Sequence, residues 1–209
     1  MLSARGTMEA MSTGLFMGVR SSYVDGAEAK AEAFLDAINR ALTQRGATPY
    51  LDPPEAPNVY KGHLFGRSEL DHHTSRVLSE ISNLGTQSSE NPNLALIRDN
   101  PYRVAFVPAD FAPPASTAYY EQIGGADTQI WVGSLPRLLT ELKQLAVQLG
   151  IPLVNGELAD ETASAINQFE SLRNGDSVKL IEDERTAWLA LYEGARLAIE
   201  HRVALTLAG

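Results

Sequence analysis

Two adjacent histidines set among acids and an arginine form the most chemistry-like stretch of the chain. The stretch reads GRSELDHHTSRVL and covers residues 66–78. Ser68 followed three residues later by Asp71 is close to a helix-capping pattern, and apolar residues then recur at helical spacing. These features predict a helix over residues 68–84.

On that helix the two histidines point in different directions, because successive residues are rotated by about 100° around the axis. His72 is expected to face solvent, whereas His73 lies at the border of the apolar face. The polar stripe along this border consists of Glu69, His73, Arg76 and Glu80. Such a stripe is typical of side-chain pairs that each stabilise a helix by about 0.2–0.5 kcal/mol.

The stripe also has functional interpretations. The first is a partner-binding surface, for which the candidate residues are Glu69, His72, His73, Arg76 and Glu80. The second is acid–base chemistry, in which Glu69 raises the pKa of His73 and makes it a proton carrier near neutral pH. A metal site would need a third ligand, and none lies nearby in the sequence, so no metal is expected.

A second candidate is the turn WVGSLPR, residues 131–137, which joins an expected strand to an expected helix. Free N–H groups at a helix start attract anions, so Ser134 and Arg137 are candidate anion-binding residues. The turn lacks the glycine and lysine pattern of a phosphate loop, which favours ordinary capping by Ser134. The chain contains neither G-x-S-x-G nor H-E-x-x-H, and no cofactor is expected.

The elements that would position these residues follow from periodicity and from glycine and proline. Strands are expected at 14–23, 128–134 and, more briefly, 151–154; helices at 25–46, 68–84, 135–150, 160–172 and 178–205. Residues 94–108 predict a hairpin with its turn at 99–101. We expect an α+β fold, in which a small mixed β-sheet is packed by about five helices.

The long C-terminal helix carries the clearest apolar stripe. Its members are Ile181, Trp188, Tyr192, Ala195, Ile199 and Val203. The stripe predicts a core face, with Arg185 and Arg196 beside it. Residues 1–12 lack periodicity and predict a flexible tail, and residues 13–209 predict a single α+β domain.

Composition and charge limit the possible partners. The 209 residues include 26 Asp/Glu, 17 Lys/Arg and no cysteine, which gives a net charge of −9 and excludes disulfides and zinc–thiolate sites. An acidic chain repels phosphate backbones, so a basic protein is a better partner than nucleic acid. No apolar run approaches the roughly 20 residues of a membrane span, and we expect a cytoplasmic protein.

The leading functional hypothesis is a non-enzymatic binding protein of the bacterial inhibitor or immunity-like type, which holds a basic protein through its acidic surface. One alternative is a hydrolase that uses His73 and Glu69 in a cleft roofed by residues 51–66. The other is a subunit of a larger assembly, with the Trp188 helix as its interface. The oligomeric state stays open.

Overall fold

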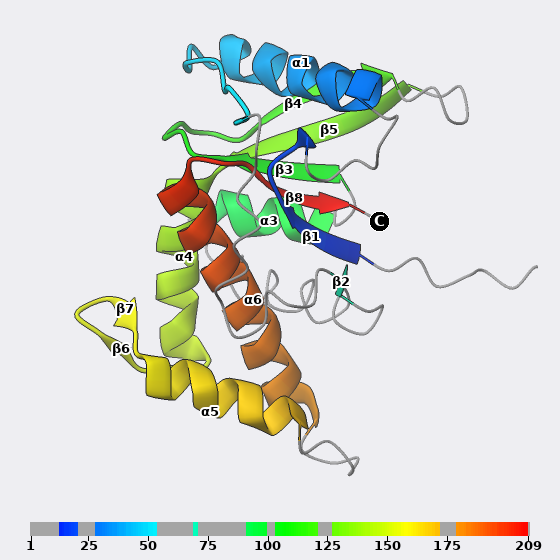
Figure 1. Ribbon diagram of the computed structural model, residues 1–209. Helices are drawn as coiled ribbons and strands as arrows, with labels where there is room; N and C mark the ends of the chain where they lie inside the picture. Colours follow the sequence, from blue (N-terminus) through cyan, green and yellow to red (C-terminus); the bar gives the residue numbers. More distant parts are fainter. Residues whose placement is uncertain are drawn as a thin grey trace, which may run out of the picture.

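The computed structural model describes residues 13–20, 28–53, 69–70, 91–99, 103–120, 127–171 and 179–208. These ranges form an α+β fold with five helices and a mixed sheet (Figure 1). The strands of the sheet, in spatial order, are β2 (Glu69–Leu70), β1 (Thr13–Met17), β8 (Leu205–Ala208), β3 (Arg103–Val107), β5 (Asp127–Ser134) and β4 (Ala115–Tyr120). The β3–β5 pair is parallel and the other pairs are antiparallel, as the prediction of a mixed sheet requires.

Helices cover both faces of the sheet. On one face lies α1 (Glu28–Gln44), which packs over β4 and β5 (Figure 1). On the other face lie α3 (Pro92–Asp99), α4 (Leu135–Gln148) and α6 (Lys179–His201). The helix α5 (Asp160–Ser171) contacts α6 at the end farthest from the sheet, beside the hairpin of β6 (Leu153–Val154) and β7 (Glu157–Leu158).

Two hydrophobic cores result from the alternation of side chains along the strands. Val104 and Phe106 of β3 enter the core shared with α3, α4 and α6, whereas Ala105 and Val107 enter the core beneath α1. Successive strand residues point to opposite faces, so β3 contributes to both cores. The apolar run of β3 is therefore that of a strand buried on both sides.

The core face predicted for the last helix is confirmed. Trp188 is 0% exposed, and its indole Nε1–H donates to the Leu142 carbonyl of α4 across 2.8 Å. Its ring stacks on Tyr192 with 4.8 Å between ring centroids. The described members of this stripe are packed inside the chain, and only Ile199 among them is partly buried.

The C-terminal helix is shorter than expected, and a strand was missed after it. The helix ends at His201 because Arg202 adopts a left-handed φ of 57°, and its N–H donates to the Ile199 carbonyl. The Val203 N–H then donates to the Ala198 carbonyl, which completes a C-terminal motif that glycine usually provides. The chain thus leaves the helix four residues early and forms β8 between β1 and β3.

The first half of the expected hairpin at 94–108 is wrong. Residues 92–99 form the helix α3, and only the second half is a strand. The buried carboxylate of Glu141 accepts hydrogen bonds from the N–H groups of Asn93 (3.2 Å) and Leu94 (2.8 Å) and from the Asn93 side chain (2.7 Å). A helix of only 8 residues depends on tertiary contacts, and this one begins on a carboxylate 47 residues away in the chain.

The helix expected over 68–84 does not begin where predicted. Glu69 and Leu70 form β2, which pairs with Gly14 and Thr13 of β1. Pairing supplies partners for backbone groups that the outer edge of β1 would otherwise leave open, and this gain overrides the capping pattern at Ser68. Residues 71–84 lie outside the described ranges, as do residues 1–12, the expected tail.

A polar clamp holds the segment after α1 to the sheet. The Tyr50 hydroxyl donates to the Asp52 carboxylate and accepts from the Ala204 N–H at 2.7 Å. Asp52 also accepts from the N–H groups of Val19 (3.1 Å) and Arg20 (2.8 Å). Burial, followed by the hydrogen bond to Asp52, raises the pKa of Tyr50, so the phenol stays protonated. The clamp joins segments more than 150 residues apart.

Candidate partner-binding surface

Acidic residues are concentrated in one part of the sequence. Residues 157–200 contain ten Asp/Glu and four Lys/Arg, a net charge of −6 in a chain whose total is −9. This segment includes β7, α5 and most of α6, and α5 lies at the end of the molecule far from the sheet (Figure 1). We call residues 157–200 the acidic segment.

Three exposed carboxylates gather where β7 leads into α5. Glu157 belongs to β7, and Asp160 and Glu161 form the first turn of α5. Acids in a first turn are stabilised by the positive end of the helix dipole. Neither Asp160 nor Glu161 has an ion-pair partner in the described part of the chain, so both charges are open to a binding partner.

Glu157 is held in place from two sides. Its carboxylate lies 2.7 Å from Lys143 Nζ of α4 and 3.0 Å from the Tyr192 hydroxyl of α6. The hydrogen bond from Lys143, followed by that from Tyr192, lowers the pKa of Glu157. Burial and the bond to Glu157 raise the pKa of Tyr192 to about 12, so Tyr192 is a neutral donor at physiological pH.

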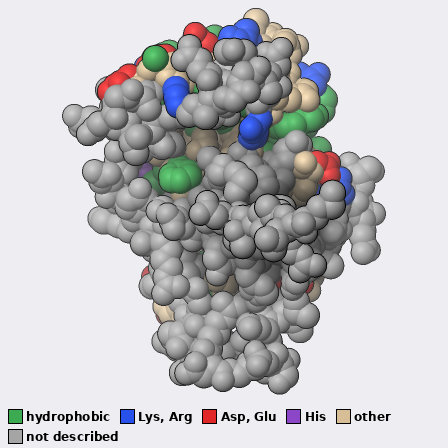
Figure 2. Space-filling model, turned by 90° about the vertical axis from the view of Figure 1, so that its right-hand side faces the viewer, with side chains coloured by type: hydrophobic (Ala, Val, Ile, Leu, Met, Phe, Trp, Pro, Cys, Tyr) green, Lys and Arg blue, Asp and Glu red, His purple; other side chains and the backbone are tan. Residues whose placement is uncertain are grey.

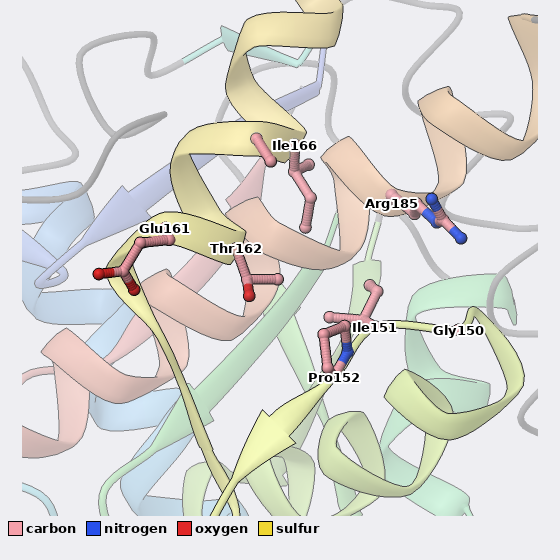
Figure 3. A pocket seen from close by; sticks show the side chains of 8 residues that line it. Gly150, Ile151, Pro152, Glu161, Thr162, Ile166 and Arg185 are labelled. Carbon is pink, nitrogen blue, oxygen red and sulfur yellow. The ribbon is translucent and has the colours of Figure 1, made fainter.

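A pocket of about 360 Å³ lies between the C-terminal end of α4, α5 and α6 (Figure 3). Its lining residues are Gly150, Ile151, Pro152, Glu161, Thr162, Ala165, Ile166 and Arg185. Figure 3 shows the Ile166 side chain of α5 pointing towards Ile151 and Pro152. The charged ends of Glu161 and Arg185 point outward on opposite sides of it. The pocket is therefore apolar inside and charged at its edge.

Arg185 is fixed by the backbone at the end of α4. Its Nε–H donates to the Leu149 carbonyl across 3.0 Å. Gly150, at φ +61°, turns the chain below it, and a Cβ at Gly150 would lie 3.3 Å from Nη2 of Arg185. The glycine thus ends α4 and leaves room for the guanidinium group.

The α1 side of the molecule carries mixed charges. Glu28, Glu32 and Asp36 lie four residues apart along the helix, but Glu32 pairs with Arg20 at 2.8 Å. The next residue at this spacing is Arg40, which donates to the Ala118 carbonyl. Figure 2 shows both Lys/Arg and Asp/Glu side chains at the top of the molecule, where α1 lies. This surface is a weaker candidate for binding a basic partner than the acidic segment.

The stripe predicted from the sequence lies mostly outside the described ranges. Of its members only Glu69 is placed, in the backbone of β2, and this strand replaces the predicted first turn of the helix. His72, His73, Arg76 and Glu80 lie in the undescribed segment 71–90. The polar stripe therefore stays a prediction. Because Glu69 and Leu70 form a strand, a helix that begins at Ser68 cannot define the geometry of the stripe.

Ser134 and Arg137 have the geometry of an ordinary helix cap. The Ser134 hydroxyl, fully buried, accepts from the Arg137 N–H at 3.4 Å, and the Ser134 N–H donates to Asn93. The Arg137 guanidinium pairs with Asp110 at 2.6 Å. The predicted capping role of Ser134 is confirmed. Within the described ranges, no group of three His, Asp or Glu residues is arranged to hold a metal ion.

The acidic surface was only partly visible in the sequence. The short strand expected at 151–154 and the helix expected from residue 160 are confirmed by β6 and α5. The approach of Lys143 and Tyr192 to Glu157 depends on packing across 14 and 35 residues, so local spacing did not reveal it. The signal available in the sequence was the excess of Asp and Glu over Lys and Arg in residues 157–200.

None of the helices in the described ranges is both long and apolar enough to span a membrane. No curated protein and no solved structure matches the chain. A family model described as "Putative DNA-mimic protein" matches residues 63–207, more than two thirds of the sequence. The matched segment contains 19 Asp/Glu and 11 Lys/Arg, so it carries −8 of the net charge of −9. The chain belongs to the Putative DNA-mimic protein family.

Proposed function

We propose that the chain is a non-enzymatic inhibitor that occupies the DNA-binding surface of a basic protein. The observation that carries this proposal is the concentration of charge within the family match. The acidic segment, residues 157–200, lies inside the match and holds −6 of the net charge, and part of that charge is exposed and unpaired. The proposal also places the protein in the compartment that contains DNA.

Carboxylates can replace phosphates in such a complex. Duplex DNA carries one negative charge per about 1.7 Å of axis, and proteins bind it with surfaces rich in Lys and Arg. A protein that presents acids to such a surface gains the same long-range attraction. Asp160 and Glu161 supply two unpaired carboxylates, and Glu157 adds a third whose position is fixed by Lys143 and Tyr192.

The structure suits binding better than acid–base catalysis. The carboxylates of Glu157, Asp160 and Glu161 are exposed, and the adjoining pocket is lined mainly by apolar side chains. A hydrolase that uses Glu69 and His73 stays a prediction on residues whose side chains are not described. A contribution of the polar stripe at residues 69–80 to partner binding also stays a prediction, for the same reason.

The test is competition with DNA. The full chain is immobilised, exposed to an extract of its native host, and the captured proteins are challenged with duplex DNA at constant ionic strength. We expect a protein that DNA displaces, and that the chain in turn displaces from labelled DNA in a gel-shift assay. Capture that yields no protein displaced by duplex DNA would contradict the proposal.

Two charge variants show whether the effect is local. The pair Asp160→Asn and Glu161→Gln neutralises the start of α5, and the pair Glu28→Gln and Asp36→Asn makes the same change in net charge on α1, outside the family match. We expect the α5 variant to lose at least tenfold in competition strength, and the α1 variant to resemble the unmodified chain. Equal losses would indicate an effect of net charge alone.

A further inference from the structure

We infer that the pocket between α4, α5 and α6 receives an apolar side chain of the basic partner. This inference rests on the proposed function and names the contact that gives it selectivity. The pocket volume of about 360 Å³ lies near the lower end of the range of about 300–1,000 Å³ that is usual for ligand sites. It is therefore large enough for one or two protein side chains.

The lining favours an apolar occupant. Ile151, Pro152, Ala165 and Ile166 supply apolar side chains to half of the eight lining positions. The charged ends of Glu161 and Arg185 point to opposite sides (Figure 3). A polar group entering the pocket would lose its hydration and find only the Thr162 hydroxyl among the uncharged side chains of the lining, which is costly. An aliphatic or aromatic side chain has no hydrogen bonds with water to lose, and the burial of its apolar surface is favourable.

The surroundings identify the carrier of that side chain as a basic protein. Glu157 and Asp160 lie within a few residues of the lining residue Glu161, and all three carboxylates are exposed. Among the described residues, Val147 and Val154 are large apolar residues with exposed fractions of 79% and 62%, and they lie in sequence on either side of the lining residues 150–152. Apolar surface beside unpaired acids complements a partner that carries both Lys/Arg and apolar residues.

A DNA mimic needs such a contact because charge alone does not select a partner. Attraction to phosphate-like charge is shared by all DNA-binding proteins and is independent of sequence. Binding energy at interfaces is concentrated in a few side chains that fill well-packed pockets. The acids would then set the association rate, and the pocket would set the lifetime of the complex with one partner.

The closing experiment fills the pocket without changing charge. Ala165→Phe places a ring in the pocket, and Ala33→Phe is the matched control, since both alanines are exposed and lie on helices. Association and dissociation rates are measured against the DNA-displaceable protein captured with the full chain. We expect Ala165→Phe to dissociate at least tenfold faster, with an unchanged association rate, and Ala33→Phe to behave like the unmodified chain.

A second measurement needs no variant and no partner. The neutral probes N-acetyl-leucine amide and N-acetyl-phenylalanine amide are titrated into the isotope-labelled full chain and followed by methyl NMR. We expect millimolar binding with shifts at Ile151 and Ile166, and no such shifts with N-acetyl-lysine amide. Shifts that are absent, or equal for the lysine probe, would overturn the assignment of an apolar occupant.

The outcomes separate the two proposals. A DNA-displaceable partner that binds Ala165→Phe as tightly as the unmodified chain overturns the pocket inference and leaves the proposed function standing. Capture that yields no DNA-displaceable protein overturns the proposed function, and with it the assignment of the pocket to such a partner. Faster dissociation of Ala165→Phe together with probe shifts at the two isoleucines supports both.

Discussion

The Tyr192 hydroxyl donates a hydrogen bond to the Glu157 carboxylate across 3.0 Å, and this bond ties the buried stripe of α6 to the acidic surface. Tyr192 is 1% exposed, and its ring stacks on Trp188. Its hydroxyl also accepts from the Leu158 N–H at 3.4 Å. The position of a surface charge is therefore set by side chains of the core.

Replacing Tyr192 with Phe should keep the stacked ring and remove both hydrogen bonds. We expect a loss of about 1–3 kcal/mol in the free energy of unfolding, because each of the two hydrogen bonds usually contributes about 0.5–1.5 kcal/mol. The pKa of Glu157 should rise towards its ordinary value, because one of its two donors is lost. Urea unfolding and a carboxyl NMR titration measure these effects. An unchanged Glu157 pKa would show that Lys143 alone sets it.

Replacing Glu141 with Ala should detach the start of α3. The buried N–H groups of Asn93 and Leu94 would lose their acceptor, and leaving a buried donor unsatisfied costs about 1–3 kcal/mol. We expect a fall in the urea midpoint and faster amide exchange across residues 92–99. The exposed Thr140→Ala serves as the neighbouring control on α4. Unchanged exchange in α3 would contradict the capping role.

Glu141 also gives a prediction for pH. Burial raises its folded-state pKa above the ordinary value of 4.5, despite the opposing hydrogen bonds from Asn93 and Leu94. A raised folded pKa makes the stabilising contribution complete below the unfolded pKa, and that contribution declines as pH rises through the folded pKa. The stability advantage of the unmodified chain over Glu141→Gln should therefore shrink as pH rises from about 4 towards 7. An advantage that grows over this interval would mean that the hydrogen bonds outweigh burial.

Replacing Gly133 with Ala should disturb the junction of β5 and α4. A Cβ at this position would lie 2.5 Å from Cδ1 of Phe106 and 2.8 Å from Oδ1 of Asn93. Overpacking of this kind usually costs about 1–3 kcal/mol. Thermal unfolding measures the effect, and Ala33→Gly on the exposed face of α1 is a control for a glycine–alanine difference alone. A neutral Gly133→Ala would show that Phe106 has room to move.

Salt should slow the association of the chain with its basic partner. The electrostatic attraction between the partner and Asp160 and Glu161 is screened beyond about 8–10 Å at physiological ionic strength. We expect the association rate measured by stopped flow to fall steeply as salt rises, with a smaller slope for the Asp160→Asn/Glu161→Gln variant. An association rate that does not respond to salt would count against binding through the acidic segment.

The helix ends show what local sequence can and cannot predict. Gly46 and Gly150, both with positive φ, end α1 and α4 where the sequence predicted. Arg202 makes the same motif without glycine, so the end of α6 and the strand β8 were missed. Only the pairing of β8 with β1 and β3 makes that early ending favourable, and strand pairing is not a local property.

The same distinction applies to α3 and to the candidate site. The N–H groups at the start of α3 donate to Glu141. In the sequence, Glu141 is indistinguishable from the other polar residues of an amphipathic helix. The net negative charge and the preference for a basic protein partner followed from composition. The grouping of Glu157 with Lys143 and Tyr192 required the packing of β7 against α4 and α6.

The hydrophobic core beneath α1 is formed jointly by residues inside the family match and residues that precede it. Its members from the sheet include Ala105, Val107, Ile130 and Val132, all inside the family match, whereas α1 and β1 precede residue 63. A homologue that has only the matched segment would expose this apolar face to water. It must therefore cover the face with an unrelated element or with another copy of itself. In this chain the segment before residue 63 supplies that cover, although it lies outside the family match.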